Sequence, residues 1–120
     1  MTHLEPREAF ELLQRTPDAL FVDCRSELEH LFVGHPTGAI QVTWSAEFVT
    51  QMRAIAAHDR TVVLICRSGN RSVDAGEALE AAGFTNVYNV LHGFEGALDH
   101  NNRRSTRSGW RFEGLPWEQC

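Results

Sequence analysis

Two kinds of apolar pattern alternate along this chain of 120 residues, and the alternation limits the folds that it can adopt. Short continuous apolar runs, which are typical of strands buried on both faces, alternate with segments whose apolar residues recur at helical spacing. Strands that alternate with helices must cross over to lie parallel, and such crossovers are right-handed. The sequence therefore predicts an α/β fold: a small open parallel sheet with helices on both faces.

The individual elements follow from these patterns and from their end signals. We expect strands at 19–22, 39–42, 61–65 and 86–91, and helices at 6–15, 45–58, 72–82 and 94–98. Ser45 is a candidate N-cap, because its hydroxyl can accept a hydrogen bond from a free amide of the first turn. From about residue 99 the chain is polar, and we expect this extension to pack as a loop anchored by Trp110, Pro116 and Trp117.

Length and composition limit the class of protein. With 120 residues, 42% of them hydrophobic and 22% charged, the chain has the size and balance of one globular domain over residues 1–120. Its longest apolar run, 62–66, is far shorter than the roughly 20 residues of a membrane helix. The first residues lack a secretory pattern. These features predict a cytoplasmic protein that has no membrane partner.

Charge and residue types exclude further classes of function. The formal net charge of −5 disfavours a nucleic-acid partner, which needs a basic surface. All 11 basic residues are arginines, so the chain has neither a lysine for a Schiff base nor a P-loop lysine. The cysteines Cys24, Cys66 and Cys120 are an odd number in a domain large enough to fold by burial. This favours a reducing compartment and at least one free thiol.

The segment after the predicted strand 61–65 carries the strongest chemical signal. Cys66 ends this strand, and five residues lead from it towards the next helix: Arg67, Ser68, Gly69, Asn70 and Arg71. Such a loop can turn its amides inward, and the helix N-terminus adds partial positive charge, so an anion is favoured at its centre. Gly69 and Asn70 tolerate unusual backbone angles, and the two arginines add charge. We therefore expect a reactive Cys66 thiolate, although a merely buried cysteine is the simpler alternative.

Several motifs follow one another in a known order. They are Val22-Asp23-Cys24-Arg25 continuing to Gly34-His35 and Gly38-Ala39, the loop from Cys66, Asn89-Val90-Leu91-His92-Gly93-Phe94, and Gly114-Leu115-Pro116-Trp117. On these motifs the chain resembles the single-domain type of the rhodanese (sulfurtransferase) family, whose active-site loop reads C-x-x-G-x-[R/S/T]. The first motif resembles the V-D-V-R signature of that family, with Cys24 at the second valine.

The resemblance implies transfer of a sulfane sulfur. Cys66 would take the outer sulfur of thiosulfate or of a persulfide and hold it as a persulfide until cyanide or a thiol, which could belong to a protein, removes it. Loop amides would stabilise the anions, and Arg71, together with Arg67, would hold the anionic donor. The substrate-binding residues would be Arg67, Ser68, Gly69, Asn70 and Arg71. No metal or organic cofactor is implied.

Two other functions stay open at this point. A non-catalytic rhodanese-like module would bind a protein partner or relay sulfur only inside a complex, although a pure docking module would have no chemical need for Cys66. A cysteine phosphatase or arsenate reductase needs the pattern C-x5-R, but Ser72 stands where this arginine would be, and Arg71 comes one residue too early. The shorter loop suits a sulfur atom better than a phosphoryl group.

Polar residues elsewhere have mainly structural interpretations. We expect Asp23 and Arg25 to form an ion pair at the edge of the sheet, and Cys24 between them to lie in the core. His30 and His35 could bind a metal ion together with Cys24, but no two of these residues have the close sequence spacing of a metal-binding motif. We expect His35 to bond to the backbone instead.

The C-terminal segment holds two further features. Four arginines cluster there: Arg103, Arg104, Arg107 and Arg111. We expect a solvated surface arm, with contact to an anion or a partner as the alternative. Cys120 is a candidate partner of Cys66 in a disulfide, since chain ends are often mobile.

Overall fold

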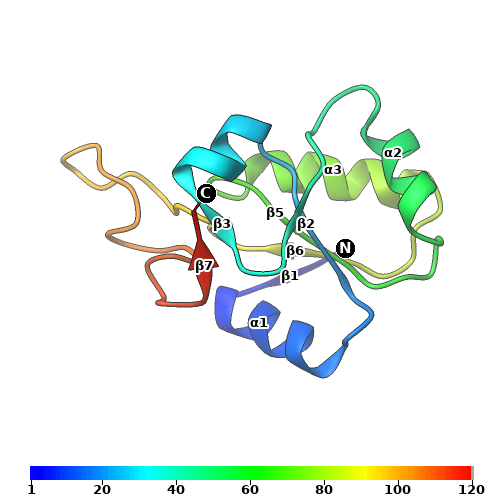
Figure 1. The fold of residues 1–120 in the computed structure, drawn as a ribbon, viewed down its shortest axis with the longest axis horizontal. Helices are drawn as coiled ribbons and strands as arrows, with labels where there is room; N and C mark the ends of the chain where they lie inside the picture. Colours follow the sequence, from blue (N-terminus) through cyan, green and yellow to red (C-terminus); the bar gives the residue numbers. More distant parts are fainter. Residues whose placement is uncertain (120) are drawn as a thin grey trace.

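Residues 1–119, which the computed structural model describes, contain a five-stranded sheet with helices against both faces (Figure 1). Its strands, in spatial order, are β1 (Thr2–Leu4), β6 (Val87–Val90), β5 (Val62–Ile65), β2 (Leu20–Asp23) and β4 (Ile40–Gln41). All neighbours are parallel. Helix α1 (Pro6–Arg15) covers one face, and α2 (Phe48–Ile55) and α3 (Asn70–Ala81) cover the other. The predicted fold class is confirmed.

Strand β5 lies at the centre of the sheet, and all four of its residues are buried. Because side chains alternate along a strand, Val62 and Leu64 pack on the side of α2 and α3, and Val63 and Ile65 pack on the side of α1. Burial on both faces explains the uninterrupted aliphatic run. The chain then leaves the carboxyl edge of the sheet at Cys66, and ligands of open α/β sheets bind at such edges.

Helix α1 has the predicted bounds, 6–15. Pro6 stands in its first turn, where a missing amide costs nothing, and the Glu5 amide donates to Glu8 Oε1 at 2.9 Å. Its inner residue Ala9 is fully buried in the cluster that covers this face of the sheet. Among residues 1–119, no helix has the length and the apolar surface needed to cross a bilayer.

The second predicted helix, 45–58, is shorter in the structure. Helix α2 begins at Phe48, and Ala56 after it already has an extended conformation. Ser45 does not cap this helix, because its hydroxyl accepts the amide of Glu47 at 3.2 Å within the turn that precedes the helix. The prediction was wrong here because the apolar spacing continues beyond the segment whose backbone is helical.

The prediction of a helix at 94–98 was wrong. The segment instead begins with a turn that is hydrogen-bonded to the Cys66 loop and braces it. The amide of Phe94 donates to the carbonyl of Cys66 at 2.8 Å, and the next two amides donate to the carbonyl of Arg67. Gly93 has a φ of +62°, and a Cβ there would lie 2.5 Å from the Cys66 carbonyl oxygen. Glycine therefore permits the close approach of the turn to the loop.

Three short strands have no counterpart among the predicted elements. β1 pairs with β6 at one edge of the sheet, and β3 (His35–Pro36) pairs with β7 (Trp117–Glu118) in a separate antiparallel ladder. These strands have two or three residues each. Alternation over so few residues carries no usable signal.

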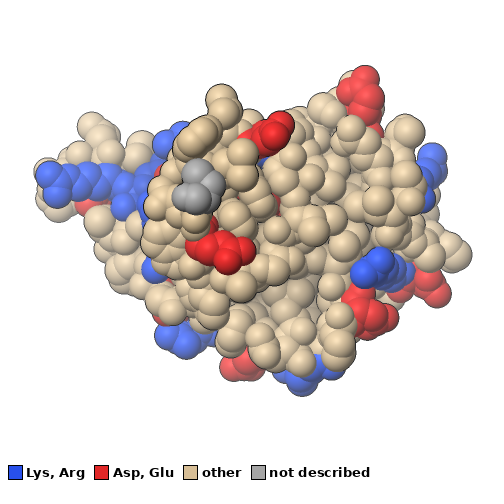
Figure 2. All heavy atoms as spheres, in the orientation of Figure 1, with Lys and Arg blue, Asp and Glu red and all other residues tan. Residues whose placement is uncertain are grey.

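The C-terminal extension is anchored near its end, as expected. Trp110 is buried, and its Nε1 donates to the Pro116 carbonyl at 2.8 Å. Before this anchor the chain projects as a loop, drawn in orange in Figure 1, and Figure 2 shows arginine side chains gathered on it. Arg103 and Arg107 are exposed, as expected of a solvated arm, whereas the other two arginines of the cluster are half-buried.

The expected ion pair of Asp23 and Arg25 is present, and both side chains are fully buried. Arg25 donates to the two carboxylate oxygens of Asp23 at 2.9 and 2.7 Å, and to the Gly34 carbonyl at 2.5 Å. Its guanidinium also lies 4.8 Å from the centroid of the Phe94 ring. The pair therefore connects the end of β2 to the chain before β3 and to the turn that braces the Cys66 loop.

We expect Asp23→Asn to lower the free energy of unfolding by about 3–5 kcal/mol, because the Arg25 guanidinium would stay buried without its charge partner. Unfolding in urea measures the difference. Glu113→Gln is the control: it removes the charge of a partly exposed pair with Arg7, at 3.3 Å, and should cost at most about 1 kcal/mol. Equal losses in the two variants would contradict the role of the buried pair.

Candidate active site

The loop after β5 folds back over Cys66, which is 1% exposed. Gly69 turns the chain with a φ of +109°, and α3 begins at the next residue, two residues before the predicted start at Ser72. The Gly69 amide points inward and donates to Cys66 Sγ at 3.1 Å. The sulfur thus lies at the N-terminal end of a 12-residue helix, where partial positive charge favours an anion.

A buried hydroxyl approaches the same sulfur from α3. Ser72 Oγ lies 3.2 Å from Cys66 Sγ and 3.2 Å from the Gly69 carbonyl oxygen, and it is hydrogen-bonded to Asn89 Oδ1. The Nδ2 atom of Asn89, on β6, lies 3.1 Å from His3 Nδ1. Ser72 and Asn89 are both buried. The hydroxyl is therefore held in place beside the sulfur, and its single proton faces three acceptors: the sulfur, Asn89 Oδ1 and the Gly69 carbonyl oxygen.

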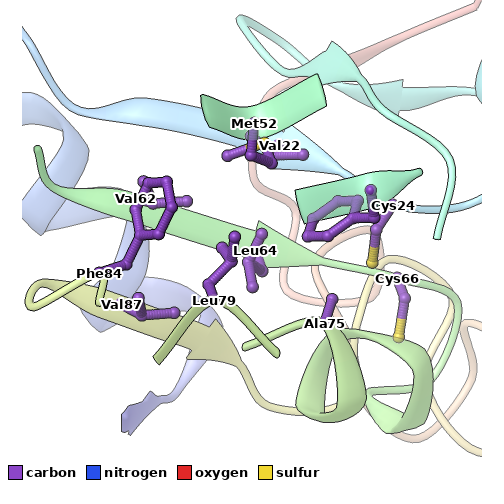
Figure 3. Packing of buried hydrophobic residues seen from close by; sticks show 11 residues of the cluster. Val22, Cys24, Met52, Val62, Leu64, Cys66, Ala75, Leu79, Phe84 and Val87 are labelled. Atoms are coloured by element: carbon purple, nitrogen blue, oxygen red, sulfur yellow. The ribbon is translucent and has the colours of Figure 1, made fainter. Parts of the chain in front are cut away.

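A second thiol, Cys24, lies beside Cys66, directly after the end of the neighbouring strand β2. The pairing of β2 with β5 reaches Asp23 and Ile65, and the Cys24 amide extends it by donating to the Ile65 carbonyl at 2.9 Å. Figure 3 shows the Cys24 sulfur directed towards Cys66 across this pair of strands. Cys24 is fully buried in the core, as expected, and it belongs to the same buried cluster as the candidate nucleophile.

These contacts lower the pKa of Cys66 from an ordinary value of about 9 to about 5. The largest cause is the hydrogen bond from the Cys24 thiol; the Ser72 hydroxyl and the amides of Ser72 and Gly69 act in the same direction, and burial opposes them. Hydrogen bonding to Cys66, burial and the charge of Cys66 raise the pKa of Cys24. At neutral pH the pair therefore consists of a Cys66 thiolate and a Cys24 thiol.

Each of the two arginines predicted to bind an anionic donor is paired with a carboxylate. Arg71 donates through both terminal nitrogens to Glu29 at 2.9 and 3.0 Å, and Glu29 begins the short π-helix η1 (Glu29–Val33). Arg67 Nε lies 3.2 Å from a Glu95 oxygen. Hydrogen bonding to Arg71 lowers the pKa of Glu29 to about 2. The positive charges of the loop are thus balanced locally.

The remaining predicted residues lie on the outer side of the loop. Ser68, Gly69 and Asn70 border a surface hollow together with residues that include His3 and His92. Ser68 is half-buried, and Asn70 is exposed. Of the residues predicted to bind substrate, the structure places the Gly69 amide at the sulfur and the side chains of Ser68 and Asn70 beside the hollow.

The histidines weighed as metal ligands make other contacts. His30 and His35 stack with ring centroids 3.7 Å apart. His35 Nδ1 lies 2.7 Å from the carbonyl oxygen of His30, which is the backbone bond expected of it, and His30 Nδ1 lies 2.8 Å from an Asp23 oxygen. Within residues 1–119, no three His, Cys, Asp or Glu side chains are grouped as metal ligands.

Sequence reasoning missed three neighbours of the loop. The position of Cys24 had a signal, because strand alternation places equivalent residues of parallel neighbours on one face of a sheet. Ser72 was interpreted only as a helix start, and the contact of Glu29 with the loop spans 42 positions and has no pattern in the sequence. Cys120, the other candidate partner of Cys66, lies outside the described residues.

Comparison with known proteins assigns the fold and the loop to a family. A family model described as the rhodanese-like domain matches residues 6–100, which contain both cysteines of the site. The chain belongs to the rhodanese-like domain family. The crystal structure of an M. tuberculosis protein superposes on this rhodanese-like domain with a TM-score of 0.91 and 38% identity, covering 100% of this chain and 98% of that one.

Two similar proteins have names that state an activity. Thiosulfate sulfurtransferase GlpE of Haemophilus influenzae is 29% identical to this rhodanese-like domain over 93 residues, which are 78% of this chain and 84% of GlpE. The polysulfide-sulfur transferase homodimer of Wolinella succinogenes has a TM-score of 0.74 and 25% identity, covering 100% of this chain and 80% of that one. Both names state a transfer of sulfur.

The Cys66 thiolate should titrate with a midpoint near pH 5 in this rhodanese-like domain. Cys24→Val removes the largest cause of the low pKa, so the midpoint should rise towards 9, and Ser72→Ala should raise it less. The midpoint is obtained from the rate of alkylation by iodoacetamide as a function of pH. Mass spectrometry of the peptide that contains Cys66 distinguishes its alkylation from that of the other thiols. A midpoint unchanged in both variants would contradict the assignment of these donors.

Proposed function

We propose that this rhodanese-like domain is a sulfurtransferase that carries sulfane sulfur as a persulfide on Cys66. The observation that supports the proposal is a buried thiol held ionised, with the Gly69 amide 3.1 Å and the Ser72 hydroxyl 3.2 Å from its sulfur. The thiolate is the nucleophilic form of cysteine, and a free thiol is preserved in a reducing compartment such as the cytoplasm. The proposed chemistry needs no metal or organic cofactor.

The reaction has two steps. First, Cys66 Sγ attacks the outer sulfur of the donor, whose S–S bond breaks and whose electron pair leaves with sulfite or with a thiolate. Second, cyanide or a thiol, including a protein thiol, attacks the outer sulfur of the persulfide, and Cys66 leaves as a thiolate. Because the leaving group of the second step is that thiolate, the donors around Cys66 assist discharge as well as loading.

The paired arginines bear on the choice of donor. A sulfonate that bound Arg71 would have to compete with Glu29, which already accepts two hydrogen bonds from that guanidinium. The pKa of Glu29, about 2, keeps this carboxylate ionised throughout the range in which Cys66 is a thiolate. A persulfide without an anionic head meets no such competition. We therefore propose a persulfide as a better donor than thiosulfate, a dianion.

The test of the carrier step is Cys66→Ser, which should abolish both the gain of one sulfur atom and the formation of thiocyanate from cyanide. The chain is incubated with thiosulfate or with a small-molecule persulfide, and its intact mass is measured after removal of the donor. Circular dichroism checks that the fold is intact. The variant retains Cys24 and Cys120, so sulfur that it still gains and transfers would show that Cys66 is not the carrier.

The test of donor choice is Glu29→Gln, which keeps the shape of the side chain but removes its charge. We expect kcat/KM for thiosulfate to rise several-fold, because the Arg71 guanidinium becomes available to the anion, while kcat/KM for an uncharged persulfide changes little. Glu113→Gln, on the surface, controls for the loss of one negative charge. A fall with both donors would show that the Glu29–Arg71 pair serves only the loop conformation.

A further inference from the structure

The two cysteines lie side by side across paired strands, with the Cys24 sulfur directed towards Cys66 (Figure 3). The register of β2 with β5 joins Asp23 to Ile65, and the next backbone bond brings Cys24 opposite Cys66. Adjacent strands lie about 4.8 Å apart, and the Cα atoms of disulfides lie about 4.4–6.8 Å apart. Both side chains point to the face of the sheet that α2 and α3 cover (Figure 3). The backbone therefore holds these cysteines within the separation that a disulfide spans.

The surroundings leave Cys24 a single reaction partner. Its side chain is fully buried in an apolar cluster that includes Phe48 and Ala75. Its thiol donates to the Ile65 carbonyl oxygen at 3.3 Å, and Cys66 belongs to the same buried cluster. Cys66 is also nearly buried, at 1% exposed, but its loop borders a surface hollow, whereas Cys24 lies in the apolar cluster, so we expect a dissolved thiol or donor to reach Cys66 first. Sulfur chemistry at Cys24 must go through Cys66.

We propose a second activity that rests on the proposed function: Cys24 attacks the inner sulfur of the Cys66 persulfide, releases the carried sulfur as hydrogen sulfide and leaves a Cys24–Cys66 disulfide. The domain thereby discharges a bound sulfur without an external sulfur acceptor. The cysteine that the fold places in the core acts as the resolving thiol of the carrier.

Atoms and electrons balance in this step. The Cys24 thiol gives up its proton, and its sulfur forms a bond to Cys66 Sγ. The bond from Sγ to the outer sulfur breaks, and the electron pair leaves on the outer sulfur, which takes up the proton and departs as hydrogen sulfide. The two cysteine sulfurs are oxidised and the sulfane sulfur is reduced, so no separate oxidant takes part. Two equivalents of a small thiol then reduce the disulfide and restore both cysteines.

The same contacts explain why the discharge does not empty the carrier at once. Hydrogen bonding to Cys66, burial and the nearby negative charge raise the pKa of Cys24, so its nucleophilic thiolate form is scarce. An external acceptor thiol attacks the exposed end of the persulfide and needs no ionisation of Cys24. Transfer is therefore faster when an acceptor is present, and sulfide release dominates when acceptors are absent.

The experiment uses the full chain, reduced, loaded with thiosulfate and freed of donor and thiols. The wild-type chain should first gain one sulfur atom and then lose it, with sulfide released in an amount equimolar with the chain. Its final mass should be two hydrogens below that of the reduced chain, and peptide mapping should find Cys24 joined to Cys66. Sulfide is trapped with monobromobimane and quantified over time.

Cys24→Ser is the matched variant, because serine retains a hydrogen-bond donor beside Cys66 but has no sulfur to form the disulfide. It should gain the sulfur atom and keep it, with loss of sulfide release. Cys24→Val, which carries the valine of the V-D-V-R signature, provides a second variant if serine destabilises the core; because it should raise the pKa of Cys66, it is loaded to completion at higher pH before release is followed. Cys120→Ser should release sulfide at the wild-type rate.

The outcomes separate this inference from the function on which it rests. A wild-type chain that gains sulfur and holds it as long as Cys24→Ser does would overturn the discharge step and leave the sulfurtransferase intact. The discharge step would also be overturned if Cys120→Ser released no sulfide and peptide mapping of the wild-type chain found Cys120 in the disulfide. If neither the wild-type chain nor the Cys24 variants gain sulfur from thiosulfate or from a persulfide, the carrier function itself fails, and the discharge fails with it.

Discussion

A negatively charged sulfur buried at the end of the central strand is the constraint on which the site depends. Burial by itself would raise the pKa of Cys66, so hydrogen-bond donors must surround the sulfur if it is to be a thiolate. They come from two elements: the Cys24 thiol follows β2, and Gly69 and Ser72 open α3. The registered pairing of β2 with β5 and the short connection to α3 bring them together. The parallel sheet therefore sets the ionisation of the cysteine as well as its position.

The arginines of the loop serve this arrangement indirectly. Arg71 joins α3 to Glu29 on η1, and Arg67 joins the loop to Glu95 in the bracing turn. Both pairs tie the loop to neighbouring segments of the chain, and their charges are balanced. Ser72 stands where a C-x5-R phosphatase would need a guanidinium, and it is buried with its hydroxyl near the sulfur. The loop is therefore organised around one sulfur atom by neutral dipoles.

Elements with long or strongly apolar patterns could be predicted from the sequence. Helix α1 has its predicted bounds, and the buried strand expected at 61–65 became β5, Val62–Ile65. The helix expected at 94–98 could not be recognised as a turn, because its amides bond to the carbonyls of a loop distant in the sequence. Strand β1 could not be predicted because three residues gain their conformation only from pairing with β6. Local patterns report local preference, and these segments are fixed by distant backbone partners.

The sequence by itself determined the alternation of strands and helices, the place of Cys66 at a strand end before a glycine-containing turn, and the likeness of its motifs to rhodanese-like proteins. These features depend on residue type and spacing along the chain. Only the tertiary structure decided which groups touch the sulfur and which carboxylates bind the arginines. Such contacts join residues up to 42 positions apart, as in Glu29 with Arg71. Their strength depends on burial and orientation, which arise only when the strands are paired and the helices are packed against them.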